Sequence, residues 1–101
     1  MQTVNITSAT TTTLRSLSTS LTGNIKSMRF TNTSQSTTVR VILFLEDSSS
    51  NKFYISTVDL PGLTSLLLTE GLNYNTELYA LKLTTDAGGL STSTPLSVII
   101  Q

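Results

Sequence analysis

Apolar and polar residues alternate along much of this chain at the spacing of two that is typical of β-strands. The longest alternation lies in residues 37–46. One side of this segment carries four aliphatic residues, Val39, Val41, Leu43 and Leu45. The other side carries Ile42 and Phe44 between a charged residue at each end. The pattern predicts a strand whose aliphatic side faces the core. Its Ile42/Phe44 side is either a second buried layer or a contact surface.

Shorter segments with the same alternation recur along the chain, and clusters of Ser, Asn, Gly and Pro separate them. Together with residues 37–46 we expect strands at residues 3–7, 25–31, 52–58, 63–69, 77–85 and 95–100. Residues 47–51 have the composition of a hairpin turn, and the Pro and Gly of residues 60–62 predict a bend. About seven short strands predict an all-β fold, a single-domain antiparallel β-sandwich of Ig-like or jelly-roll-like type. A closed barrel fits less well because the strands vary in length.

The N-terminal region has a different pattern. Leu14, Leu17 and Leu21 recur at spacings of three and four among Ser and Thr, which are poor helix formers. We therefore expect residues 1–23 to form an N-terminal strand and extended arm, and residues 24–101 to form the β-sandwich domain. The three leucines either pack on their own domain or lie on a neighbouring subunit. They are candidate partner contacts in the second case.

Composition narrows the classes of function. The 101 residues suffice for one domain, and six basic and six acidic residues cancel to a net charge of zero. A neutral chain offers no electrostatic footprint for nucleic acid or an anionic membrane, and low charge favours self-association. No apolar run approaches the length of a membrane span, and the N-terminus lacks the pattern of a signal peptide. We expect a homo-oligomer with no nucleic-acid or membrane partner.

Residues that commonly supply chemistry are scarce. The chain has no His and no Cys, and its six carboxylates fall at predicted strand ends and turns. We therefore expect no catalytic residues, no cofactor and no metal, and a protein that is not an enzyme. Glu46, Asp47 and Asn51 offer oxygen ligands for Ca²⁺, but a hairpin tip in which Asp47 bonds the turn backbone fits the pattern better. Tyr74, between two Asn residues, is the aromatic residue that we expect to be most exposed.

Four consecutive stretches carry a resemblance to a known group of proteins: IKSMRFTNTS, TTVRVILFLEDSSSNKFYI, VDLPGLTSLLLTEGLNY and LYALKLTT. Their order resembles that of small structural proteins of tailed bacteriophages. In those proteins a strand ending in TN precedes an alternating strand, a Y-x-I strand, an I/L-P-x-G-T bend and a VYALK-like strand. This chain departs at the bend, where Gly62 directly follows Pro61, one position earlier than in the usual pattern.

The resemblance implies a virion protein: a capsid decoration or cement protein, or a small head- or tail-associated module. Its partners would be the major capsid protein or other virion subunits, after synthesis in the host cytoplasm. The surfaces that we expect to meet such partners are carried by Leu14, Leu17, Leu21, Ile42, Phe44 and Tyr74. Two alternatives remain, a carbohydrate- or receptor-binding module and a neck or tail adaptor. A carbohydrate site would depend on an exposed aromatic ring, for which Tyr74 is the first candidate.

Overall fold

The computed structural model describes residues 1–17, 24–69, 71–87 and 93–101. Within these ranges the chain forms strands and no helix. The strands are β1 (Gln2–Ser8), β2 (Thr11–Arg15), β3 (Asn24–Ile25), β4 (Met28–Asn32), β5 (Val39–Asp47), β6 (Lys52–Leu60), β7 (Ser65–Leu68), β8 (Leu72–Asn73), β9 (Tyr79–Asp86) and β10 (Ser93–Ile100). The predicted all-β class is therefore confirmed.

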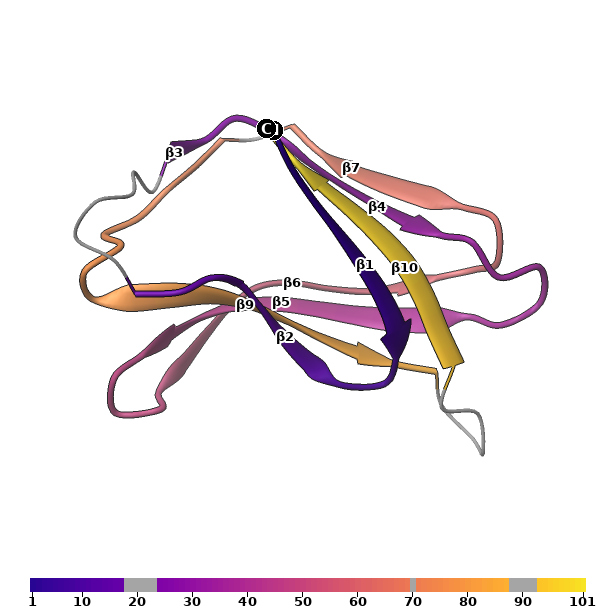
Figure 1. Cartoon of the computed structure of the whole chain (residues 1–101), viewed down its shortest axis with the longest axis horizontal. Coiled ribbons are helices and arrows are strands. Elements are labelled where there is room, and N and C mark those ends of the chain that lie inside the picture. The colour runs from indigo at the N-terminus through magenta and orange to yellow at the C-terminus, as the bar shows by residue number, and fades with distance from the viewer. Residues whose placement is uncertain (18–23, 70, 88–92) are drawn as a thin grey trace.

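The strands form two antiparallel four-stranded sheets and a small third sheet. Sheet A has the order β1-β10-β4-β7, and sheet B has the order β2-β9-β5-β6. The short strands β3 and β8 pair separately. Sheets A and B lie one above the other, with β1 and β2 toward the viewer of Figure 1 and β6 and β7 on the far side. This arrangement is compatible with a β-sandwich, while the Ig-like or jelly-roll-like type is not confirmed.

One hydrophobic core lies between the two sheets. Both contribute side chains that are almost completely buried, from sheet A Ile6, Met28, Phe30, Leu96, Val98 and Ile100, and from sheet B Leu14, Val39, Val41, Leu43, Leu60, Leu81 and Leu83. The predicted aliphatic side of the longest strand therefore faces the core. Alternation places these residues on one face of each strand, since successive side chains of a strand point to opposite faces.

The N-terminal residues belong to both sheets. β1 pairs with β10 in sheet A, and β2 pairs with β9 in sheet B. Leu14 of β2 is only 4% exposed and packs in the core of its own chain. A separate N-terminal arm is thus not confirmed for residues 2–15. The alternation was hard to recognise here because Thr fills the remaining positions of β2 before Arg15.

β5 and β6 form the long hairpin of sheet B, and their pairing contains a β-bulge. Phe44 lies opposite Tyr54, but Leu43 lies opposite Ser56, so Ile55 is an extra residue in β6. A bulge of this kind changes the facing of the residues beyond it, because the alternation of side chains is interrupted by one position. The facing of β6 therefore differs on the two sides of Ile55.

A buried asparagine holds the turns at one end of the two sheets together. Asn32, at the end of β4, is fully buried. Its Nδ2 donates to the carbonyl oxygens of Thr37 and Leu60 at 2.7 and 2.9 Å, and its Oδ1 accepts from the Ser34 N–H at 3.0 Å. These bonds join the segment after β4 to the end of β6. Asn32 thus links the turns at this end of the fold through three side-chain hydrogen bonds.

Two of the turns that the structure describes contain a residue other than glycine with positive φ, a conformation that costs most residues about 1 kcal/mol. Leu63, in the bend after β6, has φ of 59°, and Ser50, in the β5–β6 turn, has φ of 65°. In the phage pattern the bend carries Gly at the position that Leu63 occupies here. Gly62 instead allows close approach, because a Cβ at Gly62 would lie 2.7 Å from the Ser34 carbonyl oxygen. The bend forms despite the displaced glycine.

Candidate interaction surfaces

The outer face of sheet B has an aromatic centre. Phe44 points away from the main core, and yet it is only 1% exposed. The Tyr54 ring lies 5.9 Å from the Phe44 ring between centroids, and the Lys52 ammonium lies 5.3 Å from the same ring. Ile42, on the same face, is half-buried between Thr57 and Thr84. Neighbouring side chains therefore bury the predicted Ile42/Phe44 face as a second, small apolar layer.

Ion pairs flank this aromatic centre. Lys82 donates to Glu46 Oε1 at 2.6 Å, and the two side chains are 25% and 17% exposed. Arg40 contacts both carboxylate oxygens of Asp59, at 2.8 and 3.4 Å, on a more exposed part of the sheet. The bond from Arg40 lowers the pKa of the Asp59 carboxyl below its usual value. Both pairs neutralise charge on the outer face of sheet B.

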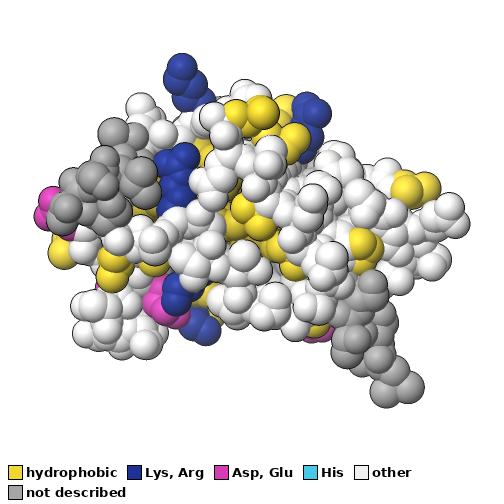
Figure 2. All heavy atoms as spheres, viewed as in Figure 1, with side chains coloured by type: hydrophobic (Ala, Val, Ile, Leu, Met, Phe, Trp, Pro, Cys, Tyr) yellow, Lys and Arg dark blue, Asp and Glu magenta, His cyan; other side chains and the backbone are white. Residues whose placement is uncertain are grey.

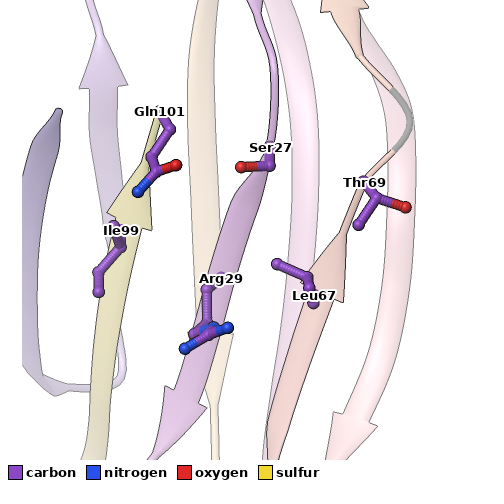
Figure 3. Close-up of a pocket in the computed structure, with 6 residues that line it drawn as sticks. All are labelled: Ser27, Arg29, Leu67, Thr69, Ile99 and Gln101. Carbon is purple, nitrogen blue, oxygen red and sulfur yellow. The ribbon is translucent and has the colours of Figure 1, made fainter.

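A shallow pocket of about 290 Å³ lies on the outer face of sheet A. Figure 3 shows Arg29 of β4 between Ile99 of β10 and Leu67 of β7, with Ser27, Gln101 and Thr69 toward one end. Arg29 is exposed, and it forms no ion pair with any residue in the described ranges. A guanidinium between two aliphatic side chains suits a partner that presents a carboxylate beside an apolar group.

A groove of about 500 Å³ lies between the far edges of the two sheets. Its walls are Ile55 and Ser56 of β6 on one side and Leu67, Leu68 and Leu72 on the other, and Met28 of the core contributes to its lining. The remaining described lining residues are Thr69 and Gly71, so the described part of the lining contains no charged side chain. A groove whose described lining is apolar or neutral, at the edges of two sheets, is suited to apolar or extended protein segments.

Several exposed apolar residues lie on the strands β6 and β7 that border this groove, or between these strands. Eight large hydrophobic side chains are exposed in the part of the chain that the structure describes. Five of them lie on β6, on β7 or between these strands: Phe53, Tyr54, Ile55, Leu63 and Leu67. By contrast, the Lys and Arg side chains on the face shown in Figure 2 are scattered and form no single patch. The edge formed by β6 and β7 thus carries most of the exposed large apolar side chains in the described ranges, and exposed apolar surface often marks an interaction site.

The partner contacts predicted from the sequence do not form one surface. Leu14 is a core residue, Leu17 is 44% exposed after β2, and Leu21 lies outside the described residues. The prediction that Tyr74 is the most exposed aromatic residue was wrong. Its side chain packs against the core, and its buried hydroxyl has no hydrogen-bond partner among the described residues, whereas Tyr54 is 65% exposed. Burial raises the pKa of the Tyr74 hydroxyl.

Asp47 has the structural role that the sequence indicates. Its Oδ1 accepts from the backbone N–H groups of Ser49 and Asn51, both at 2.9 Å, and its Oδ2 accepts from Asn51 Nδ2 at 3.1 Å. The bonds from Asn51, chiefly its backbone N–H, lower the pKa of the Asp47 carboxyl. Both carboxylate oxygens thus bond the hairpin turn. The described residues contain no group of His, Cys, Asp and Glu side chains arranged to hold a metal ion.

The edge formed by β6 and β7 could not be found from the sequence, because alternation identifies strands but not their neighbours. Among the residues that the structure describes, no helix is long and apolar enough to cross a membrane. Comparison of the chain with protein-family models, with curated proteins and with solved structures gives no match.

Proposed function

We propose that this chain is a non-enzymatic structural protein of a virus particle, one that decorates or cements the capsid of a tailed bacteriophage through protein–protein contacts. The observation that carries the proposal is the edge formed by β6 and β7, because these strands and the bend between them carry five of the eight exposed large hydrophobic residues in the part of the chain that the structure describes. The sequence resemblance supplies the phage context. The main partners would be the major capsid protein or other virion subunits, and the protein would travel from the host cytoplasm to the virion.

The outer face of sheet A supports this proposal because several of its hydroxyl and amide groups are paired with one another. The Thr31 and Ser65 hydroxyls lie 2.9 Å apart, and the Ser97 hydroxyl donates to Asn5 Oδ1 at 3.1 Å. Such groups already have partners within the sheet, so another protein can cover them without leaving them unsatisfied. Neutral groups are also far less costly to desolvate than ions. A repeating lattice then multiplies contacts that are individually weak.

In this proposal the two sheets form an Ig-like or jelly-roll-like sandwich that serves as a rigid body. A neck or tail adaptor would use the same surfaces, and the position in the particle distinguishes the two. The test is mass spectrometry of purified particles, followed by cryo-electron microscopy to place the protein. We expect the chain in stoichiometric amount on the capsid. Its absence from the virion would overturn the proposal, and a position at the neck or tail would favour the adaptor.

A second candidate function is carbohydrate or receptor binding, and the exposure of Tyr54 favours it. The Tyr54 ring is 65% exposed on the outer face of sheet B, beside Thr57 and Lys52, which offer polar groups to a sugar. A glycan array tests this function. One strong ligand, lost in Tyr54→Ala and retained in Tyr79→Ala, would support carbohydrate binding. An array without a ligand would leave the structural role as the better proposal.

A further inference from the structure

We propose that two copies of this chain pair along the free edge of β6, antiparallel about a two-fold axis. In this register Lys52 lies opposite Asp59 of the second copy, and Tyr54 lies opposite Thr57 of the second copy. The pairing would join the two copies of sheet B into one continuous sheet. The inference concerns the purified chain and holds whether or not the protein belongs to a virion.

β6 has the properties of an interaction edge. It is nine residues long and stands last in the order of sheet B, and within the described ranges no strand pairs with its outer side. Three consecutive large residues on it are exposed, Phe53 at 50%, Tyr54 at 65% and Ile55 at 37%. Long apolar edge strands offer unpaired backbone groups together with apolar surface, and they readily add another strand.

Because of the bulge, the residues of β6 that point to the outer face are placed symmetrically about the middle of the strand. This symmetry selects the register of the pairing. On one side of the bulge Lys52 and Tyr54 share the outer face, opposite Glu46 and Phe44 of β5. On the other side Thr57 and Asp59 share that same face, opposite Ile42 and Arg40. Phe53 and Val58 occupy the inner face, the former beside Tyr79 and the latter against the core.

Residues that lie directly opposite in an antiparallel pair must point to the same face. A regular strand paired with its own copy meets this condition only when the two opposite residues are separated by an even number of positions. Lys52 and Asp59 are seven positions apart in the sequence, which is an odd number. The extra residue Ile55 corrects the mismatch, so outer residues meet outer residues and inner residues meet inner ones. The two-fold axis then passes between Ile55 and Ser56.

Charge favours a second copy as the occupant of this edge. The two charged side chains of β6 have opposite sign and stand near opposite ends of the strand, Lys52 and Asp59. Antiparallel pairing brings each one opposite its counterpart in the other copy, twice in one interface. Asp59 already contacts Arg40 at 2.8 Å, so the second copy's lysine would extend an existing ion pair. An isologous contact of this kind closes after two copies.

The groove gives the pairing an apolar interior. Because the register keeps the same face outward in both copies, both copies of sheet A lie on the same side of the joined sheet. The grooves lined by Ile55, Leu67 and Leu68 then face one another across the axis. On pairing, each copy buries apolar surface that is exposed in the single chain. Burial of such surface is the main favourable contribution to association.

Two features of β6 also occur in strands that are protected from edge pairing, namely a lysine and a bulge. In the proposed pairing the lysine lies opposite a carboxylate of the second copy. The bulge lies at the two-fold axis, where it keeps the opposite side chains of the two copies on the same face of the sheet. A purely protective role would leave the chain monomeric at every concentration. The oligomeric state therefore separates the two interpretations.

Cysteine cross-linking tests the register. The chain has no cysteine, so each introduced thiol is unique. Tyr54→Cys and Thr57→Cys, mixed and oxidised, should give a cross-linked dimer, because Cβ atoms of opposite residues lie about 4.5–5.5 Å apart. Each variant alone should cross-link poorly, since its two thiols stand three positions apart along the strand, about 10 Å. The control is Tyr54→Cys mixed with Thr13→Cys, which places the second thiol on β2 at the other edge of sheet B.

Sedimentation equilibrium tests the interface itself. Ile55→Lys places two ammonium groups beside the two-fold axis and should weaken self-association about tenfold or more. Leu17→Lys is the matched control, because Leu17 is similarly exposed but follows β2 at the opposite edge. Circular dichroism verifies that both variants fold. A wild-type chain that stays monomeric at millimolar concentration, or a mixture that cross-links no better than the control, would overturn the proposal. A dimer in solution that is absent from virions would overturn only the proposed function.

Discussion

Replacement of Asn32 by Ala tests whether one buried side chain holds the turns at this end of the fold. The change removes two donated bonds and one accepted bond. The bond to the Leu60 carbonyl oxygen is buried, and an orphaned buried group costs about 2–3 kcal/mol. The other two bonds are partly buried, and each adds about 0.5–1 kcal/mol. We therefore expect Asn32→Ala to lower the free energy of unfolding by about 3–5 kcal/mol, a large part of the 5–15 kcal/mol typical of a domain.

Urea unfolding followed by circular dichroism measures this loss. The matched control is Asn75→Ala, because Asn75 is exposed and its side chain accepts one bond, from the Glu77 N–H at 2.9 Å. The control should lose about 0.5–1 kcal/mol. If Asn32→Ala lost no more than the control, with the same dependence on urea, the reasoning about buried partners would be refuted.

Asn32→Asp adds a test by pH. The carboxylate keeps an acceptor for the Ser34 N–H but turns an acceptor toward the Thr37 and Leu60 carbonyl oxygens. Burial and this repulsion would raise the pKa of the introduced carboxyl in the folded state. A raised pKa means that the folded variant gains stability relative to wild type as pH falls through that pKa, because protonation restores one donor. A stability difference that does not change with pH would contradict this account.

The remaining predictions concern single side chains. Phe44→Asp should destabilise the fold by about 3–5 kcal/mol in thermal unfolding, because it places a carboxylate in a covered apolar site; unchanged stability would show that this face is open to solvent. Tyr74→Phe should raise stability by about 1 kcal/mol, since it removes a buried hydroxyl for which the described ranges hold no partner, and a loss of stability would reveal a partner for that hydroxyl. Leu63→Gly should stabilise by about 1 kcal/mol, because Gly adopts positive φ without strain, and a lower melting temperature would argue against strain. The lowered pKa of Asp47 means that its stabilising contribution is present above the pKa of the unfolded state and is lost as pH falls through the folded pKa; NMR titration of the carboxyl measures this, and an ordinary pKa would contradict the turn bonds.

The sequence predicted the parts of the fold that local pattern governs. The alternation of residues 37–46 identified β5 and its core face, and the polar turn identified the β5–β6 hairpin together with the role of Asp47. β2 was harder to predict, because Thr is equally compatible with a strand and with an irregular arm, and only the burial of Leu14 decides. Local pattern therefore located strands but did not assign them to sheets.

The candidate surfaces were less predictable because they depend on which strands become neighbours. Phe44 is covered by Lys52 and Tyr54 from the next strand, and alternation within β5 carries no information about that cover. The insertion of Ile55 as a bulge has no signature in an uninterrupted run of strand formers. Tyr74 was misjudged for a related reason, since its flanking Asn residues indicate a turn but not the direction of its ring.

The position of β10 has a consequence for how the chain folds. This last strand lies between β1 and β4 in the interior of sheet A, and its pairing joins residues 2–8 to residues 93–100. On the ribosome, β1 therefore emerges long before the strand that it pairs with, and β4 likewise lacks one neighbour. Sheet A is completed only when synthesis of β10 ends, and such distant pairings fold slowly. The core can therefore close only after β10 has been made, well after the β5–β6 hairpin is able to form.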